Sequence, residues 1–135
     1  MLTSPSPHHE NHDSYGFRVD PTGLLMAVAD GVSSHPDAKQ ASLAAVKSVM
    51  AYIGSDPAEM FWRSHKKVMA LKGPSTTLVT AHVTERQIVF ASLGDSNAYL
   101  YSERDASFRR VFPQSQTNQV FEWIGKWNFP EPAVV

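Results

Sequence analysis

The sequence contains no cysteine. This absence excludes disulfide frameworks, zinc-thiolate sites, iron–sulfur clusters and cysteine nucleophiles, so any metal site must use oxygen or imidazole ligands. An excess of charge of one sign is also missing, because 12 basic residues are offset by 13 acidic ones. Without a basic excess there is no bulk electrostatic attraction to nucleic acid or to an anionic membrane, and we expect neither as a partner.

Long hydrophobic runs are lacking as well. The apolar stretch over residues 24–29 is far shorter than the roughly 20 residues that a helix needs to cross a bilayer. Residues 1–12 are rich in Ser, Pro and His and show neither the basic nor the apolar segment of a secretory signal. We therefore expect a soluble, cytoplasmic protein whose residues 1–12 form a flexible arm.

The remaining residues, 13–135, contain enough apolar side chains for a single domain, since 42% of the chain is hydrophobic. Residues 15–20 and 24–29 read as strands joined by a tight turn, and an Ala-rich helix follows from Pro36 to Ile53. A second helix begins near Ser55 or Asp56 and continues to Leu71. Four strands are expected over residues 75–83, 87–92, 98–101 and 108–112, and a closing helix over residues 119–127. This order predicts an α+β fold with antiparallel strands.

Two turns that contain an aspartate are candidate catalytic or metal-binding positions. Asp30-Gly31 follows a buried strand, which places a carboxylate where a rigid scaffold meets solvent. The glycine would let the backbone approach an ion and present its carbonyl as a hard ligand. Gly94-Asp95-Ser96 offers a second carboxylate in the same kind of setting. Taken singly, each motif is better explained as an ordinary turn.

The segment from His8 to Asp13 gathers imidazoles and carboxylates. Its histidines could bind a transition metal adventitiously, as a mobile arm does. Asp13 lies next to the first strand and is the better candidate for a fixed role.

Together these segments resemble the metal-dependent protein phosphatases of the PPM (PP2C) family. The resemblance rests on their order along the chain: Asn11-x-Asp13, Ala27-Val28-Ala29-Asp30-Gly31-Val32, a long Ala-rich helix, Gly73-Pro74-Ser75-Thr76-Thr77, and Leu93-Gly94-Asp95-Ser96 before an aromatic strand. It implies a PP2C-like antiparallel β-sandwich flanked by helices, with two Mn²⁺ or Mg²⁺ ions at one edge. It also implies hydrolysis of phosphoserine and phosphothreonine in a phosphoprotein substrate by a water that the two ions share.

Site roles follow from the same resemblance. Asp30 would bridge the two ions and Gly31 would offer its carbonyl, while Asp13 would orient metal-bound water as a catalytic residue alongside Asp30. Asp95 would lie where some members hold a weaker third ion, and Thr77 with its neighbour Thr76 would support the central strand.

The sequence also departs from the family pattern. His8 stands where the family has a phosphate-gripping arginine and lacks that side chain's bidentate fork, so it is a weak phosphate ligand. Asn97 replaces the arginine that usually follows Gly-Asp-Ser, and His12 replaces a residue that is often acidic or Gln. The family's later Thr-Asp-Gly and Asp-Asn motifs do not occur after Tyr101. The domain therefore reads as truncated.

Three interpretations stay open. The chain is a short or truncated phosphatase whose missing ligands come from a second chain or from a C-terminal half. Alternatively, it is a catalytically inactive pseudophosphatase that binds proteins. It could also form a homodimer that buries sheet edges and the C-terminal aromatic residues Trp123, Trp127 and Phe129.

Overall fold

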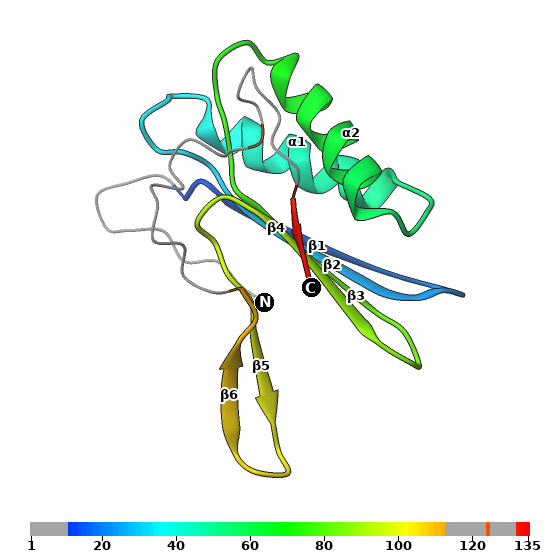
Figure 1. Ribbon diagram of the computed structural model, residues 1–135. Coiled ribbons are helices and arrows are strands. Elements are labelled where there is room, and N and C mark those ends of the chain that lie inside the picture. The colour runs from blue at the N-terminus through cyan, green and yellow to red at the C-terminus, as the bar shows by residue number, and fades with distance from the viewer. Residues whose placement is uncertain (1–10, 113–123, 125–131) are drawn as a thin grey trace.

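The computed structural model describes residues 11–112, 124 and 132–135. Its main layer is a five-stranded antiparallel sheet in the order β1-β2-β3-β4-β7 (Figure 1). The strands are β1 (Asp13–Asp20), β2 (Gly23–Asp30), β3 (Leu78–Val83), β4 (Ile88–Leu93) and β7 (Ala133–Val134). A separate two-stranded ribbon consists of β5 (Tyr99–Ser102) and β6 (Ser107–Arg110). The predicted α+β fold with antiparallel sheets is confirmed.

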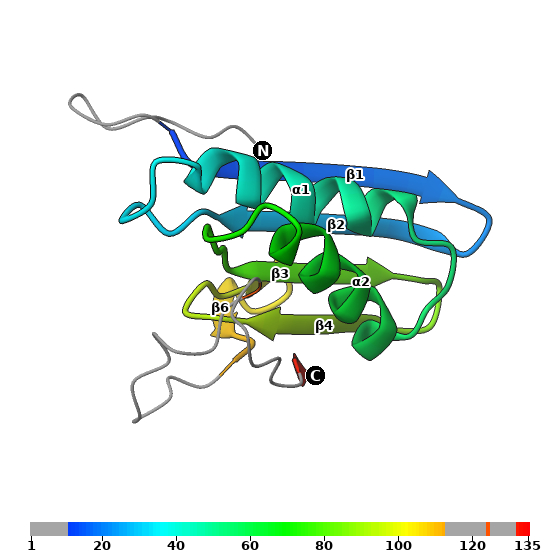
Figure 2. The same cartoon turned by 90° about the horizontal axis from the view of Figure 1, so that it is seen from above.

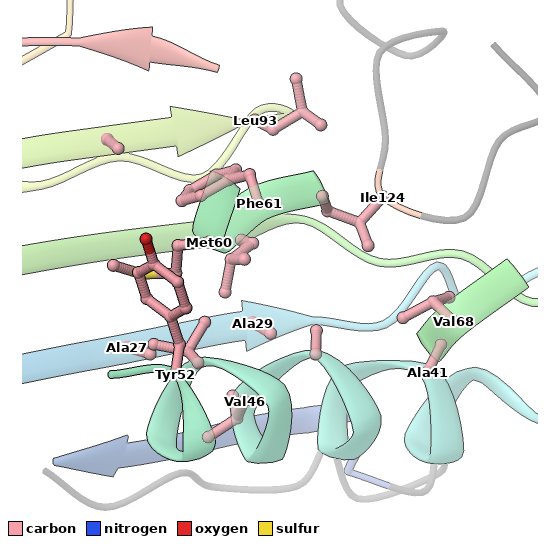
Figure 3. Close-up of a cluster of buried hydrophobic side chains, with 14 of the residues drawn as sticks. Ala27, Ala29, Ala41, Val46, Tyr52, Met60, Phe61, Val68, Leu93 and Ile124 are labelled. Carbon is pink, nitrogen blue, oxygen red and sulfur yellow. The ribbon is translucent and has the colours of Figure 1, made fainter. Parts of the chain in front are cut away.

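Two helices cover one face of the main sheet, α1 (Ala38–Ala51) and α2 (Pro57–Met69) (Figure 2). The core lies between them and the strands (Figure 3). Phe61 of α2 is fully buried there, among side chains from β2, β3 and β4. Small residues on α1 and β2, including Ala27, Ala41 and Ala45, let the helix approach the sheet closely.

Local sequence explains most element boundaries. The Asp56 carboxylate accepts a hydrogen bond from the Ala58 amide at 3.0 Å, and Pro57 occupies the first helical position of α2. The expected extension of α1 to Ile53 is wrong: the helix ends at Ala51, and Ile53 is 93% exposed. Its backbone turns away at Tyr52, whose extended conformation lets the ring pack into the core instead.

The opposite face of the sheet carries no helix among the residues described. Side chains alternate along each strand, so residues that do not point toward α1 and α2 point to this side. We call this surface the helix-free face; within the paired register it comprises Asp13, Tyr15, Phe17, Val19, Leu24, Met26, Val28, Asp30, Val79, Ala81, Val83, Ile88, Phe90, Ser92 and Ala133. The β5–β6 ribbon projects on this side, away from the helices (Figure 1).

Several expectations fall outside the residues that the structure describes. They include His8, most of the predicted closing helix over residues 119–127, and Trp123, Trp127 and Phe129. Ile124 is described and contradicts that helix at its own position, because it exchanges two backbone hydrogen bonds of 3.0 Å with Thr76 as a β-bridge. In the described ranges no helix is long and apolar enough to span a membrane.

Candidate metal centre

The register of β1 and β2 brings two carboxylates together. Asp13 at the start of β1 pairs directly with Asp30 at the end of β2, so both side chains lie at one end of the helix-free face. The Asn11 side chain holds this end of β1 by accepting a hydrogen bond from the Asp13 amide at 3.0 Å. The Gly31 amide donates to the His12 carbonyl at 3.1 Å, which continues the pairing beyond the strand.

The carboxylate of Asp95 lies at the same edge, because hydrogen bonds between hydroxyl groups hold its turn there. The Asp30 amide donates to the Thr77 hydroxyl at 3.0 Å, and this hydroxyl lies 2.6 Å from that of Ser96. The Ser92 hydroxyl in turn donates to the Ser96 carbonyl at 3.2 Å. These contacts fix the Gly94–Ser96 turn beside β2, and Asp95 lines a cavity of about 160 Å³ with Asp30, Gly31, Val32, Ser33 and Thr77.

The neighbouring carboxylates at this edge affect the protonation of Asp30. Partial removal from water raises the pKa of Asp30 to about 6, with a hydrogen bond to Asp13 and repulsion by the Asp13 and Asp95 carboxylates acting in the same direction and His12 opposing them. A hydrogen bond between two carboxyl groups requires that one of them carry a proton. A divalent cation would take the place of that proton and relieve the repulsion.

Gly31 has a steric role that the sequence does not reveal. A Cβ atom at this position would stand 2.2 Å from the Ala38 carbonyl oxygen at the start of α1. That distance is well inside van der Waals contact, and the Ala38 oxygen is a backbone atom that cannot move without shifting the helix. Helix α1 can therefore pack this closely against the strand end only if residue 31 is a glycine. Close packing of α1 is therefore sufficient reason for Gly31, and its service as a carbonyl ligand stays a prediction.

Helix α1 also holds the backbone of the site from behind. The Ser42 hydroxyl donates to the His12 carbonyl at 2.6 Å and lies 2.8 Å from the Ser14 hydroxyl. The Lys39 ammonium donates to the Asp13 carbonyl. Sequence reasoning missed these supports, because a Lys and a Ser on an Ala-rich helix carry no signal until the helix is docked.

Asn97, which stands where the family pattern has an arginine, hydrogen-bonds to the backbone of neighbouring segments. Its side-chain amide donates to the Phe112 carbonyl at 2.8 Å, and its side-chain oxygen accepts from the amides of Phe112 at 3.1 Å and Ala98 at 2.8 Å. Asn97 thus closes the base of the β5–β6 ribbon. Gly94 has φ of +103°, so the turn that carries Asp95 also needs its glycine for conformational reasons.

The chemistry of these donors fits a hard divalent cation, although only in part. Carboxylate and carbonyl oxygens are the ligands that Mg²⁺ and Mn²⁺ prefer. Within residues 11–112, 124 and 132–135, however, no group of three or more acidic, His or Cys side chains is close enough to enclose an ion. The site thus provides a carboxylate pair, a third carboxylate nearby and a main-chain oxygen, rather than a complete cage for two ions.

Comparison with known proteins decides the family. The model of the family described as protein phosphatase 2C matches residues 8–122, which is most of the chain. The chain belongs to the protein phosphatase 2C family. The predicted family is therefore confirmed.

Relatives within the protein phosphatase 2C family show how much of the domain is represented. The phosphoserine phosphatase RsbX of Bacillus subtilis is 27% identical over 96 residues, covering 71% of this chain and 48% of RsbX. The chain thus spans about half the length of that curated relative.

Solved structures agree on the fold. The serine/threonine phosphatase Stp1 of Staphylococcus aureus superimposes with a TM-score of 0.81 at 19% identity, covering 99% of this chain and 68% of Stp1. The catalytic domain of the serine/threonine phosphatase PstP, solved with two manganese ions, gives a TM-score of 0.74 at 17% identity, covering 97% of this chain and 67% of PstP.

Proposed function

We propose that this chain takes part in metal-dependent hydrolysis of phosphoserine and phosphothreonine in proteins. The observation that carries the proposal is the convergence of Asp13, Asp30 and Asp95 at one sheet edge, where partial burial, followed by a hydrogen bond to Asp13 and repulsion between the carboxylates, raises the pKa of Asp30 to about 6. Family membership and a relative solved with two manganese ions support it.

In this proposal Asp30 and Asp95 hold Mn²⁺ or Mg²⁺, assisted by the Gly31 carbonyl. When bound, such an ion makes its water more acidic and neutralises charge on the phosphoryl group. Asp13 would accept a hydrogen bond from the attacking water and orient it toward phosphorus. Thr77 and Ser96 keep the two loops in register, so the carboxylates hold their spacing without an ion to draw them together.

The remaining ligands of a two-ion site must come from elsewhere, because one bridging carboxylate cannot neutralise two divalent ions. We propose that a second chain or a further part of the domain supplies them. The weak phosphate-binding role of His8, the flexible arm over residues 1–12, the single domain over 13–135 and the cytoplasmic location stay predictions.

A pseudophosphatase that binds phosphoproteins without hydrolysis is the second candidate. Two observations favour it: Asn97 is committed to hydrogen bonds with Phe112 and Ala98, and the described residues do not enclose an ion by themselves. The two candidates share the fold and differ in turnover, so a single assay separates them.

The test is hydrolysis of a phosphothreonine peptide and of p-nitrophenyl phosphate with saturating Mn²⁺, followed by chelation. With the second chain or further domain part that completes the site present, we expect turnover that chelation removes and that Asp30→Asn lowers by at least about 100-fold, the scale of losing a main electrostatic group. Glu85→Gln is the matched control, since it removes one exposed carboxylate at the β3–β4 turn, beyond the other end of β3. Turnover that survives Asp30→Asn would contradict the proposal, and absence of turnover with retained Mn²⁺ binding would favour the pseudophosphatase.

A further inference from the structure

Basic residues are concentrated on the two helices. Residues 37–72 contain six of the 12 basic residues of the chain but only three of its 13 acidic ones. The three acidic residues, Asp37, Asp56 and Glu59, all lie at the start of a helix, where the helix dipole favours negative charge. Beyond these starts α1 and α2 carry only basic charge, on Lys39, Lys47, Arg63, Lys66 and Lys67.

Three of these basic side chains line one groove between the helices. Arg63, Lys66 and Lys67 of α2 lie across from Ser48 and Tyr52 of α1, around a groove of about 520 Å³. Most of the lining residues are exposed, so the groove opens to solvent. Figure 2 looks onto this side of the helices, which faces away from the sheet.

Aromatic rings and a carboxylate hold two of the cations in place. The Arg63 guanidinium lies over the Tyr52 ring, 5.2 Å from its centroid, and its Nε donates to the Glu59 carboxylate at 2.9 Å. The Lys66 ammonium lies 5.7 Å from the centroid of the Trp62 ring. Side chains that are already held lose less conformational entropy when they bind an anion, so this groove is partly organised for one.

The fold accounts for only part of this positive charge. Lys66 and Lys67 lie in the last turn of α2, where the helix dipole favours cations. Glu59, the one acidic side chain among the described residues that line the groove, pairs with Arg63. Neither Lys66 nor Lys67 forms an ion pair with a described residue. The groove therefore keeps an excess of positive charge that a negatively charged partner would neutralise.

The shape of the groove favours a chain segment as that partner. Its α2 side extends from Glu59 to Ala70, about 17 Å along the helix, which a helical segment of about 12 residues would span. A segment lying between two helices contacts both of them, whereas a flat anionic membrane surface would reach only the rim. Carboxylate side chains are the groups that arginine and lysine pair with in proteins.

We propose that an acidic segment of a protein partner binds the groove between α1 and α2, with its carboxylates on Arg63, Lys66 and Lys67. The helices lie on the opposite side of the sheet from the helix-free face, where Asp30 lies, so a partner bound here would leave the candidate metal centre open. The proposal requires neither metal nor turnover, and its test is separate from that of the proposed function.

Fluorescence anisotropy with a labelled peptide of about 12 residues, half Glu and half Ala, tests the proposal on the full chain. The same peptide with Gln in place of Glu is the uncharged probe. At about 100 mM NaCl, which screens charges that are not in close contact, we expect the acidic peptide to bind with a dissociation constant on the order of 100 µM. The Gln peptide should not bind.

Reversing the charge of two groove lysines should weaken this binding. We expect Lys66→Glu with Lys67→Glu to lower the affinity by at least about tenfold, because two attractions become repulsions. Arg109→Glu with Arg110→Glu is the matched control: it changes the net charge equally, at exposed positions of β6 on the other side of the sheet, and should alter the affinity by less than about twofold. Circular dichroism checks the fold, and Lys66→Gln with Lys67→Gln should give a smaller loss of about threefold if the reversed pair misfolds.

Four results would overturn the proposal. They are a wild-type chain that does not bind the acidic peptide, an equal loss of affinity in the lysine and arginine pairs, tighter binding to phosphatidylserine vesicles than to the peptide, and self-association that only the lysine pair abolishes. The last two would assign the groove to a membrane or to a second copy of the chain. Peptide binding without phosphatase activity would leave this proposal standing and refute only the catalytic one.

Discussion

Phe61→Ala should lower the free energy of unfolding by about 3–5 kcal/mol, the range observed when a large buried aromatic residue is truncated. The Phe61 ring is fully buried between α2 and the sheet and is the largest wholly enclosed side chain among the described residues. It lies in the cluster that also contains Leu93 and Ile124 (Figure 3). A domain of this size has about 5–15 kcal/mol of stability in total, so the variant should be marginal.

Urea unfolding followed by circular dichroism measures this effect. Ile53→Ala removes an apolar side chain that is 93% exposed and should change the free energy by less than about 0.5 kcal/mol. Equal losses in the two variants would contradict the placement of α2 against the sheet.

Asp30→Asn should make the metal-free chain more stable at neutral pH while it abolishes divalent-ion binding. The pKa of Asp30 is about 6 in the folded state, above the 3.8 of an unperturbed Asp. The folded protein therefore binds this proton more tightly than the unfolded chain does, and stability falls as the pH rises through this interval. The cost is absent below about pH 4 and complete above about pH 6.

Asn carries no such cost, so the stability difference between the variant and the wild type should appear as the pH rises. Because Asp30 is only partly removed from water and remains in contact with solvent, screening reduces the gain to about 1 kcal/mol, or a few degrees in the melting temperature. Thermal melts with a chelator at about pH 4.5 and about pH 7.5 measure it, with Glu85→Gln as control. A wild type and variant that melt at equal temperatures at both pH values would show that the carboxylates do not repel one another as described.

Much of the fold could be predicted from the sequence because local patterns determine it. Alternating and apolar runs gave the strands to within a few residues, and Asp56 with Pro57 marked the start of α2. The end of α1 was wrong because Ile53 continues the helical spacing, while packing of the Tyr52 ring ends the helix earlier. Periodicity alone does not show which of two nearby apolar side chains packs into the core.

The candidate site, too, could be predicted from the sequence only in part. The resemblance to the protein phosphatase 2C family predicted that Asp13, Asp30 and Asp95 belong to one site, and the antiparallel register and the Thr77–Ser96 contact bring them to one edge. Sequence alone could not reveal that Gly31 is also required by the Ala38 carbonyl, or that Ser42 anchors the site's backbone. Both effects depend on where α1 docks.

The central claim is that the edge formed by Asp13, Asp30 and Asp95 binds a divalent cation. Calorimetric titration of Mn²⁺ into the metal-free chain at about pH 7.5 and about pH 5 tests it most directly, since a proton on Asp30 competes with the ion. We predict binding at the higher pH, an affinity weaker by about tenfold at the lower pH, and no binding by Asp30→Asn. Binding that is equal in wild type and Asp30→Asn, or no heat from the wild type at either pH, would contradict it.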